Sequence, residues 1–191
     1  GAKVCIADIQ DERGQQLCSN LGDYLNVCYF HCDVTVEDDV ICAVDFTVDK
    51  FGSLDIMVNN AGVSGPPCSD IRNFELSVFE NVFNINVKGV FLGMKHAARI
   101  MIPLKKGSIV SLCSAASAMG GVGPHAYVGS KHAVSGLTKN VAAELGKHNI
   151  RVNCVSPYAV ATSLALAHLP EDERTEAAMD GFRSFVGRHA N

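Results

Sequence analysis

The sequence lacks the features that mark several classes of protein. Its 191 residues contain no tryptophan and no apolar run near the roughly 18 residues of a membrane span, and no signal peptide opens the chain. Basic residues stand singly except at Lys105-Lys106, and the net charge is −4, so we expect neither nucleic acid nor a membrane as partner. None of the eight cysteines forms a CxxC pair or has zinc-finger spacing with histidine. We therefore expect no metal, and a cytoplasmic protein with reduced, buried thiols.

Five apolar stretches predict β-strands. They are rich in β-branched residues and nearly continuous rather than alternating, which is typical of strands buried on both faces of a parallel sheet. The stretches are KVCIADI (3–9), VCYFHCDV (27–34), LDIMVNN (54–60), SIVSLCS (108–114) and RVNCVSP (151–157).

Helical segments lie between these strands. We expect Gly22 to cap the first helix and Thr35 to be the N-cap of the second, whose first turn carries acids that suit the helix dipole. The expected helices cover 11–22, 36–52, 77–101 (ending near Pro103), 125–148 and a charged tail at 170–188. This alternation predicts an α/β fold, a doubly wound parallel sheet in a single domain.

Ligands of such sheets bind at the carboxyl ends of the strands. Asp8 ends the first strand, where a carboxylate can bind both hydroxyls of an adenosine ribose and favours NAD over NADP, or can cap the next helix. Asp33 and Val34 end the second, where they can receive an adenine ring or form a turn before Thr35. NNAG (59–62) ends the third, and its small residues allow a ligand close to the backbone or form an ordinary turn.

A serine and a tyrosine–lysine pair follow the fourth strand. Ser114 ends that strand, and Tyr127 and Lys131 lie four residues apart, on one face of the expected helix. Thr162 closes SPYAVAT after the fifth strand. The YxxxK pair alone is a weak signal, whereas the ordered set of strand-end residues is specific.

This ordered set resembles the short-chain dehydrogenase/reductase family over essentially the whole chain. The resemblance implies a Rossmann fold, NAD as cofactor, a small-molecule alcohol as substrate and a homotetramer. It implies a catalytic tetrad of Asn86, Ser114, Tyr127 and Lys131. It implies cofactor contacts by Asp8, Asp33, Val34, Asn59, Ala61, Gly62, Val160 and Thr162, with Tyr127 and Lys131 also at the nicotinamide ribose.

The resemblance also implies a role for each member of the tetrad. Tyr127 would act as base towards the hydroxyl of a secondary alcohol, and the ammonium of Lys131 would favour the charged phenolate. Ser114 would hold the substrate oxygen, and Asn86 would hold a water that links Lys131 to solvent. The product would be a ketone, with the hydride passed to NAD.

The sequence departs from the family at both ends. The glycine-rich TGxxxGxG loop, the first strand and the last strand are absent, and Pro157-Tyr158 replaces the usual Pro-Gly. We therefore expect a fragment of an enzyme of roughly 260–290 residues. In it the strands beginning at Lys3 and Leu54 lose their shared neighbour. Two alternatives stay open: a related dehydrogenase of a lignan or terpenoid alcohol, and a catalytically silent binding protein on the same scaffold.

Overall fold

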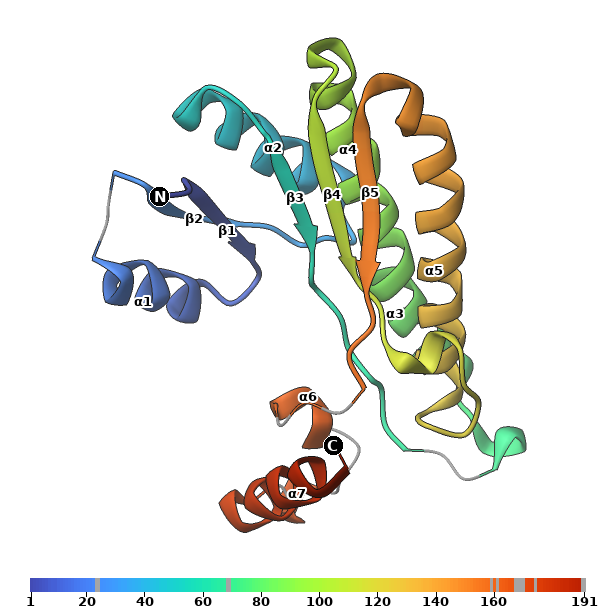
Figure 1. Ribbon diagram of the computed structural model, residues 1–191. Coiled ribbons are helices and arrows are strands. Elements are labelled where there is room, and N and C mark those ends of the chain that lie inside the picture. Colours follow the sequence, from blue (N-terminus) through green and yellow to red (C-terminus); the bar gives the residue numbers. More distant parts are fainter. Residues whose placement is uncertain are drawn as a thin grey trace.

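Five parallel strands form two separate sheets in the described part of the chain. The computed structural model describes residues 1–22, 25–67, 70–158, 160, 162–166, 171–173 and 175–189. One sheet pairs β1 with β2, and the other has the order β3-β4-β5 (Figure 1). The strands are β1 (Val4–Asp8), β2 (Val27–His31), β3 (Ile56–Asn59), β4 (Gly107–Leu112) and β5 (Ile150–Val155). The parallel pairing agrees with the predicted fold class, and each strand lies within its predicted stretch or begins one residue before it.

The helices follow the predicted alternation with strands. They are α1 (Asp11–Leu21), α2 (Glu37–Phe51), α3 (Leu76–Phe83), α4 (Gly89–Leu104), α5 (His125–Leu145), α6 (Ser163–Leu166) and α7 (Glu176–His189). Short 3-10 turns are η1 (Ile71–Asn73), η3 (Ala115–Ser117), η4 (Gly146–His148) and η5 (Glu171–Glu173). None of the helices in the described ranges is long and apolar enough to cross a membrane.

Two helix ends test the capping predictions. Gly22 caps α1 in the left-handed conformation, with φ of 64°, as predicted. Thr35 is not the N-cap of α2; that position is held by Val36, which makes no side-chain cap. The prediction was wrong because the Asp33 carboxylate accepts a hydrogen bond from the Thr35 N–H at 2.8 Å, which places Thr35 in a turn ahead of the helix.

The predicted helix over 77–101 is interrupted by a wider turn. Between α3 and α4 lies η2 (Asn84–Lys88), a π-helical turn in which the Gly89 N–H donates to the Asn84 carbonyl. Turns of this kind often occur at functional sites. The helix continues through Pro103, which lies in its last turn, and ends at Lys105 with φ of 49°.

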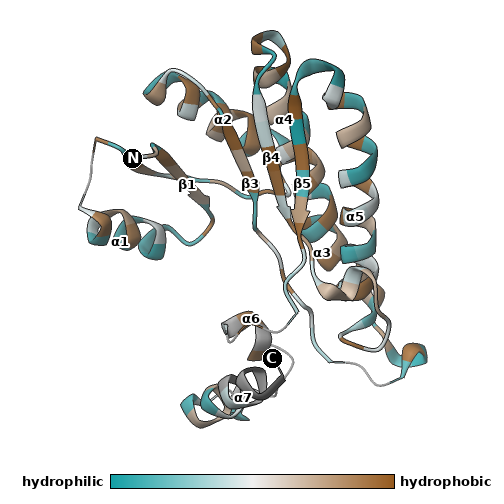
Figure 2. Ribbon diagram, viewed as in Figure 1, coloured by the Kyte–Doolittle hydropathy of each residue, from teal (hydrophilic) through white to brown (hydrophobic). Residues whose placement is uncertain are grey.

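The main core lies on one face of the three-stranded sheet. In Figure 1, α4 lies behind the strands and α5 lies beside β5, and Figure 2 shows β3 in the brown of hydrophobic residues, with pale or teal segments on β4 and β5. The buried cluster includes Met94, Met101, Ile109, Val134 and Ile150. Exposure alternates along β4 and β5, and Val155 is 51 % exposed. Burial on both faces was therefore a wrong prediction, because the helix α1 packs against β1 and β2 instead.

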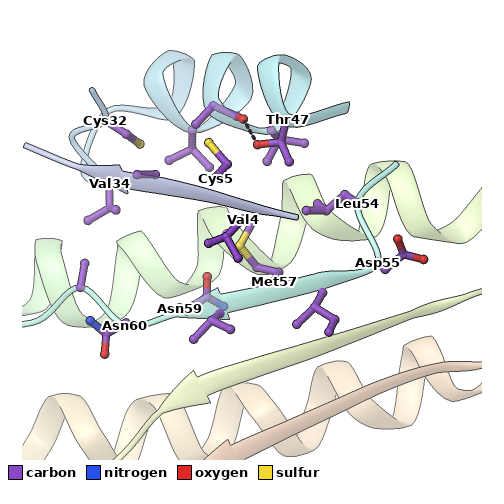
Figure 3. A pocket seen from close by; sticks show the side chains of 18 of the residues that line it. Val4, Cys5, Cys32, Val34, Thr47, Leu54, Asp55, Met57, Asn59 and Asn60 are labelled. Carbon is purple, nitrogen blue, oxygen red and sulfur yellow. Dashed lines mark hydrogen bonds between the residues drawn. The ribbon is translucent and has the colours of Figure 1, made fainter. Parts of the chain in front are cut away.

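A cleft separates the two sheets. It has a volume of about 670 Å³, and it is lined by the edge of β1 away from β2 and by the edge of β3 away from β4. Val4 and Met57 point towards one another across it (Figure 3). Helices α2 and α4 close its back, with Val44 and Gly93 among the lining residues. Two strand edges that face a cleft in this way retain backbone groups that can pair with a further strand.

Candidate active site

Helix α5 carries the tyrosine and the lysine of the YxxxK pair. Pro124 occupies its N-cap, a position where no backbone N–H is needed, and the helix buries one face against the core. Tyr127 is half-buried and Lys131 is buried on this face. The Lys131 Nζ lies 5.5 Å from the centroid of the Tyr127 ring. The helix therefore holds a phenol and an ammonium side by side at the carboxyl end of β4.

Lys131 is held at both ends by residues at the end of β4. Its Nζ donates a hydrogen bond to the Leu112 carbonyl at 2.7 Å. The Cys113 thiol donates to the Lys131 carbonyl at 3.2 Å. Burial lowers the pKa of Lys131, since removing the ammonium from water disfavours its charged form. The position of this amine is therefore fixed, and its proton is easier to release than that of a solvated lysine.

Asn86 lies at the centre of the site, fully buried in the π-turn η2. Its Oδ1 accepts the Val63 N–H at 2.8 Å. Its Nδ2 donates to the Val63 carbonyl at 2.9 Å and to the Ser130 Oγ at 3.0 Å. Both N–H donors of the side chain are thus taken by protein acceptors. Ser130 was missed by the sequence analysis, although it directly precedes Lys131.

Ser114 lies where β4 ends, and it begins the short turn η3, which packs against α5. Its Oγ accepts a hydrogen bond from the Ala116 N–H at 3.1 Å, and the residue is 8 % exposed. This bond orients the hydroxyl oxygen and leaves its own hydrogen able to donate to a bound substrate.

The NNAG segment connects this site to the cleft. The Asn59 Nδ2 donates to the Ser111 Oγ at 3.2 Å, which ties β3 to β4. A β-carbon on Gly62 would lie 3.3 Å from the Asn86 Oδ1 and 3.7 Å from the Lys131 Nζ. A side chain at position 62 would therefore crowd the Asn86 amide oxygen and lie in contact with the Lys131 ammonium.

The strand-end residues of the first sheet lie on the other side of the cleft. Asp8 and Val34 line it together with Asn59, Asn60 and Ala61. The Asp8 Oδ1 accepts the Gln10 N–H at 2.9 Å, which fixes the carboxylate at the end of β1. Hydrogen bonds from Thr35, its backbone N–H first, lower the pKa of Asp33, so this carboxylate is charged over a wider pH range. The structure thus brings four of the predicted cofactor contacts, Asp8, Val34, Asn59 and Ala61, into one cleft.

Val160 and Thr162 lie apart from this cluster. Val160 is 54 % exposed, and the Thr162 Oγ1 is 3.5 Å from the Val160 carbonyl. The segment after β5 runs away from the sheets towards α6 and α7 (Figure 1), and neither residue is among those that line the cleft. Within the described residues, no three His, Cys, Asp or Glu side chains gather as a metal site.

Comparison with known proteins places this arrangement in a family. The profile of the short chain dehydrogenases matches residues 1–173. Over its full length the chain is 76 % identical to (+)-borneol dehydrogenase 2 of Salvia officinalis and 66 % identical to xanthoxin dehydrogenase of Arabidopsis thaliana. It spans 68 % of the length of each of these relatives.

A solved structure supports the same assignment. The crystal structure of NAD⁺-bound xylitol dehydrogenase is similar with a TM-score of 0.75 and 34 % identity, covering 81 % of this chain and 59 % of that one. The sequence and structure comparisons together confirm the predicted family and its Rossmann-like α/β fold. The chain belongs to the short-chain dehydrogenase family.

Proposed function

We propose that the protein oxidises a secondary alcohol to a ketone with NAD as cofactor. The observation that carries this proposal is the pairing of Tyr127 with the buried ammonium of Lys131 at the carboxyl end of β4, beside Ser114. Membership of the short-chain dehydrogenases supports the reaction class. The similarity to an NAD⁺-bound xylitol dehydrogenase supports the cofactor.

The residues at the carboxyl ends of the strands that line the cleft fit a dinucleotide. Asp8 places a fixed carboxylate where ribose hydroxyls can donate to it, and Val34 gives an apolar wall for a base. Gly62 leaves room for a close approach of a ligand to the backbone beside Lys131. NAD would be held by these residues, and when bound it supplies the acceptor for the hydride. Asp33, Val160 and Thr162 remain proposed contacts on the strength of the family pattern alone.

The chain's own residues manage the proton. Tyr127 takes the proton of the substrate hydroxyl as the hydride leaves carbon, and Ser114 donates a hydrogen bond that holds the substrate oxygen. The Lys131 ammonium lies 5.5 Å from the centroid of the Tyr127 ring, so a positive charge lies beside the reacting phenol. Burial lowers the pKa of Lys131, which helps it to pass a proton onward.

For the substrate we propose a terpenoid alcohol, with a lignan alcohol as the alternative. The sequences of several segments, such as GGVGPHAYVGSKHAV and SPYAVATSLALAHLP, resemble those of xanthoxin dehydrogenase. This resemblance predicts oxidation of xanthoxin to abscisic aldehyde, a step of abscisic acid synthesis. The identity of 76 % to a borneol dehydrogenase, against 66 % to xanthoxin dehydrogenase, favours borneol. We therefore rank borneol first and xanthoxin second, with a lignan alcohol third.

The decisive experiment measures NADH formation from a panel of these alcohols, using the longest natural form of the protein. We expect turnover of borneol or xanthoxin with NAD, and a lower kcat/KM with NADP. Absence of NADH formation with every alcohol, in a folded protein, would refute the proposed function and favour a silent binding role. Light scattering on the same sample tests the tetramer that the family implies, and localisation of a tagged protein in cells tests the cytoplasmic assignment.

The cleft between the sheets supports a second part of the proposal. A strand supplied by sequence beyond the 191 residues occupies the part of the cleft between β1 and β3, pairs with both, and leaves the residues at their carboxyl ends, Asp8, Asn59 and Ala61, to the cofactor. Calorimetric titration of the 191-residue chain with NAD tests this. We expect weak binding or none, and tight binding by a monomeric, cooperatively folding chain would contradict the idea.

A further inference from the structure

Ser130 is a buried serine that joins two parts of the site. It is 0 % exposed and lies on α5 between Tyr127 and Lys131. Its Oγ donates to the Tyr127 carbonyl at 2.7 Å and accepts from the Asn86 Nδ2 at 3.0 Å. The hydroxyl therefore uses its single hydrogen within the helix and offers its lone pair to the π-turn η2.

The bond from Ser130 continues through Asn86 to the loop after β3. The Asn86 side chain pairs with the backbone of Val63 through both its Oδ1 and its Nδ2, at 2.8 Å and 2.9 Å. Val63 follows Gly62 directly, and a β-carbon on Gly62 would lie 3.7 Å from the Lys131 Nζ. The hydrogen bonds from Ser130 to Asn86 and from Asn86 to Val63 thus set the distance between the Gly62–Val63 backbone and Lys131.

We propose that Ser130 is a positioning residue, which clamps Asn86 and, through it, the Gly62–Val63 backbone to the helix that carries Tyr127 and Lys131. Its catalytic part rests on the proposed dehydrogenase function. Ser130 touches neither the substrate nor the reacting atoms in this role. It holds the loop of residues 59–63, which lines the cofactor cleft at Asn59 and Ala61, in register with the lysine.

Loss of the hydroxyl loosens this clamp for a specific reason. Without Ser130 Oγ, one N–H of the fully buried Asn86 amide has no acceptor, and a buried donor without a partner is costly. The amide can then rotate to seek another acceptor, which breaks its bonds to Val63. The loop can move away from Lys131, so the bound cofactor and the base are misaligned, and small misplacements lower turnover strongly.

Hydrogen exchange of the Val63 amide tests the clamp without any need for activity. In Ser130→Ala we expect this amide to exchange about tenfold faster than in the wild type, which corresponds to about 1.4 kcal/mol of lost protection. The matched control is Thr138→Ala on the same helix. Thr138 is 5 % exposed, and its Oγ1 donates to the Val134 carbonyl at 2.8 Å, but it lies about two helical turns along α5 from Ser130. The control should leave Val63 exchange unchanged, and equal rates in wild type and Ser130→Ala would overturn the proposal.

Kinetics of the longest natural form test the catalytic consequence. We expect Ser130→Ala to lower kcat and to raise the KM for NAD, with a combined loss in kcat/KM of about tenfold or more. Ser130→Cys keeps a weaker donor and acceptor of similar size, so it should partly restore both kcat and the KM for NAD. It replaces Ser130→Ala in the experiment if that variant does not fold. Faster Val63 exchange with unchanged kcat/KM would refute the positioning role. If the wild type has no dehydrogenase activity, the proposed function fails, and the exchange comparison still decides the clamp.

Discussion

The two halves of the molecule differ in how well they are packed. The three-stranded half, β3 to β5 with α4 and α5, buries Met101, Ile109 and Val134 completely. In the two-stranded half, β1 and β2 with α1, apolar side chains stay in contact with solvent: Val4 is 42 % exposed and Leu17 is 47 % exposed. A two-stranded sheet covered by one helix has few ways to bury its residues.

This difference coincides with a division of labour. Asn86, Ser114, Tyr127 and Lys131 all belong to the three-stranded half or to the helical turn that leads into α4. Asp8, which selects between NAD and NADP in our proposal, belongs to the two-stranded half. In our proposal, the chemistry that requires precisely fixed positions therefore lies in the better-packed half, and recognition of the adenosine ribose of the cofactor lies in the less well-packed half.

The largest expected effect comes from removing the phenol. Tyr127→Phe keeps the ring beside Lys131 but deletes the proton acceptor, so kcat should fall by about 10²–10⁴-fold. Affinity for NAD should change little, because the ring still packs in its place. NADH absorbance gives kcat, and calorimetry on the same protein gives the Kd for NAD. Substantial turnover in this variant would show that another group is the base.

The packing contrast predicts unequal losses of stability. Met94, which is 2 % exposed, lies in the core of the three-stranded half, and Met94→Ala should lower the free energy of unfolding by about 2–5 kcal/mol. Val4→Ala, at a half-exposed position of β1, should cost less than about 1 kcal/mol in the 191-residue chain. Urea unfolding of both variants measures the two values. Similar losses would mean that the halves fold as one equally packed unit.

Much of the fold was readable in the sequence because it depends on local patterns. The apolar stretches located the five strands of the described residues, and Gly22 and the Tyr127–Lys131 spacing are local signals of a helix end and a helix face. Burial on both faces of the strands was a wrong prediction because it depends on which helix covers which sheet. Contacts between segments far apart in the sequence decide which helix covers which sheet. The cleft between the two sheets likewise depends on such contacts.

The clamp on Asn86 was invisible to the sequence for a related reason. Its bonds join Asn86 to Val63 and Ser130, which lie 23 and 44 residues away, so no local spacing announces them. The available signal was weaker: Ser130 lies three residues after Tyr127, on the same helix face, where a small polar side chain needs a buried partner. Thr35 shows the opposite case. Threonine is a favoured N-cap residue, but the Thr35 N–H donates to the Asp33 carboxylate and Val36 occupies the N-cap of α2.

A smaller effect is expected from the carboxylate of the two-stranded half. Asp8→Asn keeps an acceptor for the Gln10 N–H, so the end of β1 should hold its shape. The variant loses the charge that strengthens hydrogen bonds from ribose hydroxyls, and the KM for NAD should rise about tenfold. The KM for NADP should fall, since repulsion of a 2′-phosphate is removed. An unchanged ratio of kcat/KM values for the two cofactors would mean that Asp8 does not reach the ribose.

The smallest effect concerns the contact of α2 with α4, behind the cleft. The Glu37 carboxylate lies 2.6 Å from the Lys95 Nζ and 2.9 Å from the His96 Nε2, and these hydrogen bonds, Lys95 first, lower the pKa of Glu37. A folded pKa below the unfolded one gives stability that is present above the unfolded value of about 4.5. This stability is lost as the pH falls through the folded pKa.

Glu37→Gln should therefore lower the urea midpoint slightly at pH 7, and the difference from the wild type should vanish once the pH falls below the folded pKa. The effect is small because the carboxylate is solvent-exposed and its ion pair is screened. Asp38→Asn, a neighbouring change in the first turn of α2, is the matched control for charge alone. If the urea midpoints of wild type and Glu37→Gln still differ at low pH, packing of the side chain, rather than its charge, stabilises the contact of α2 with α4.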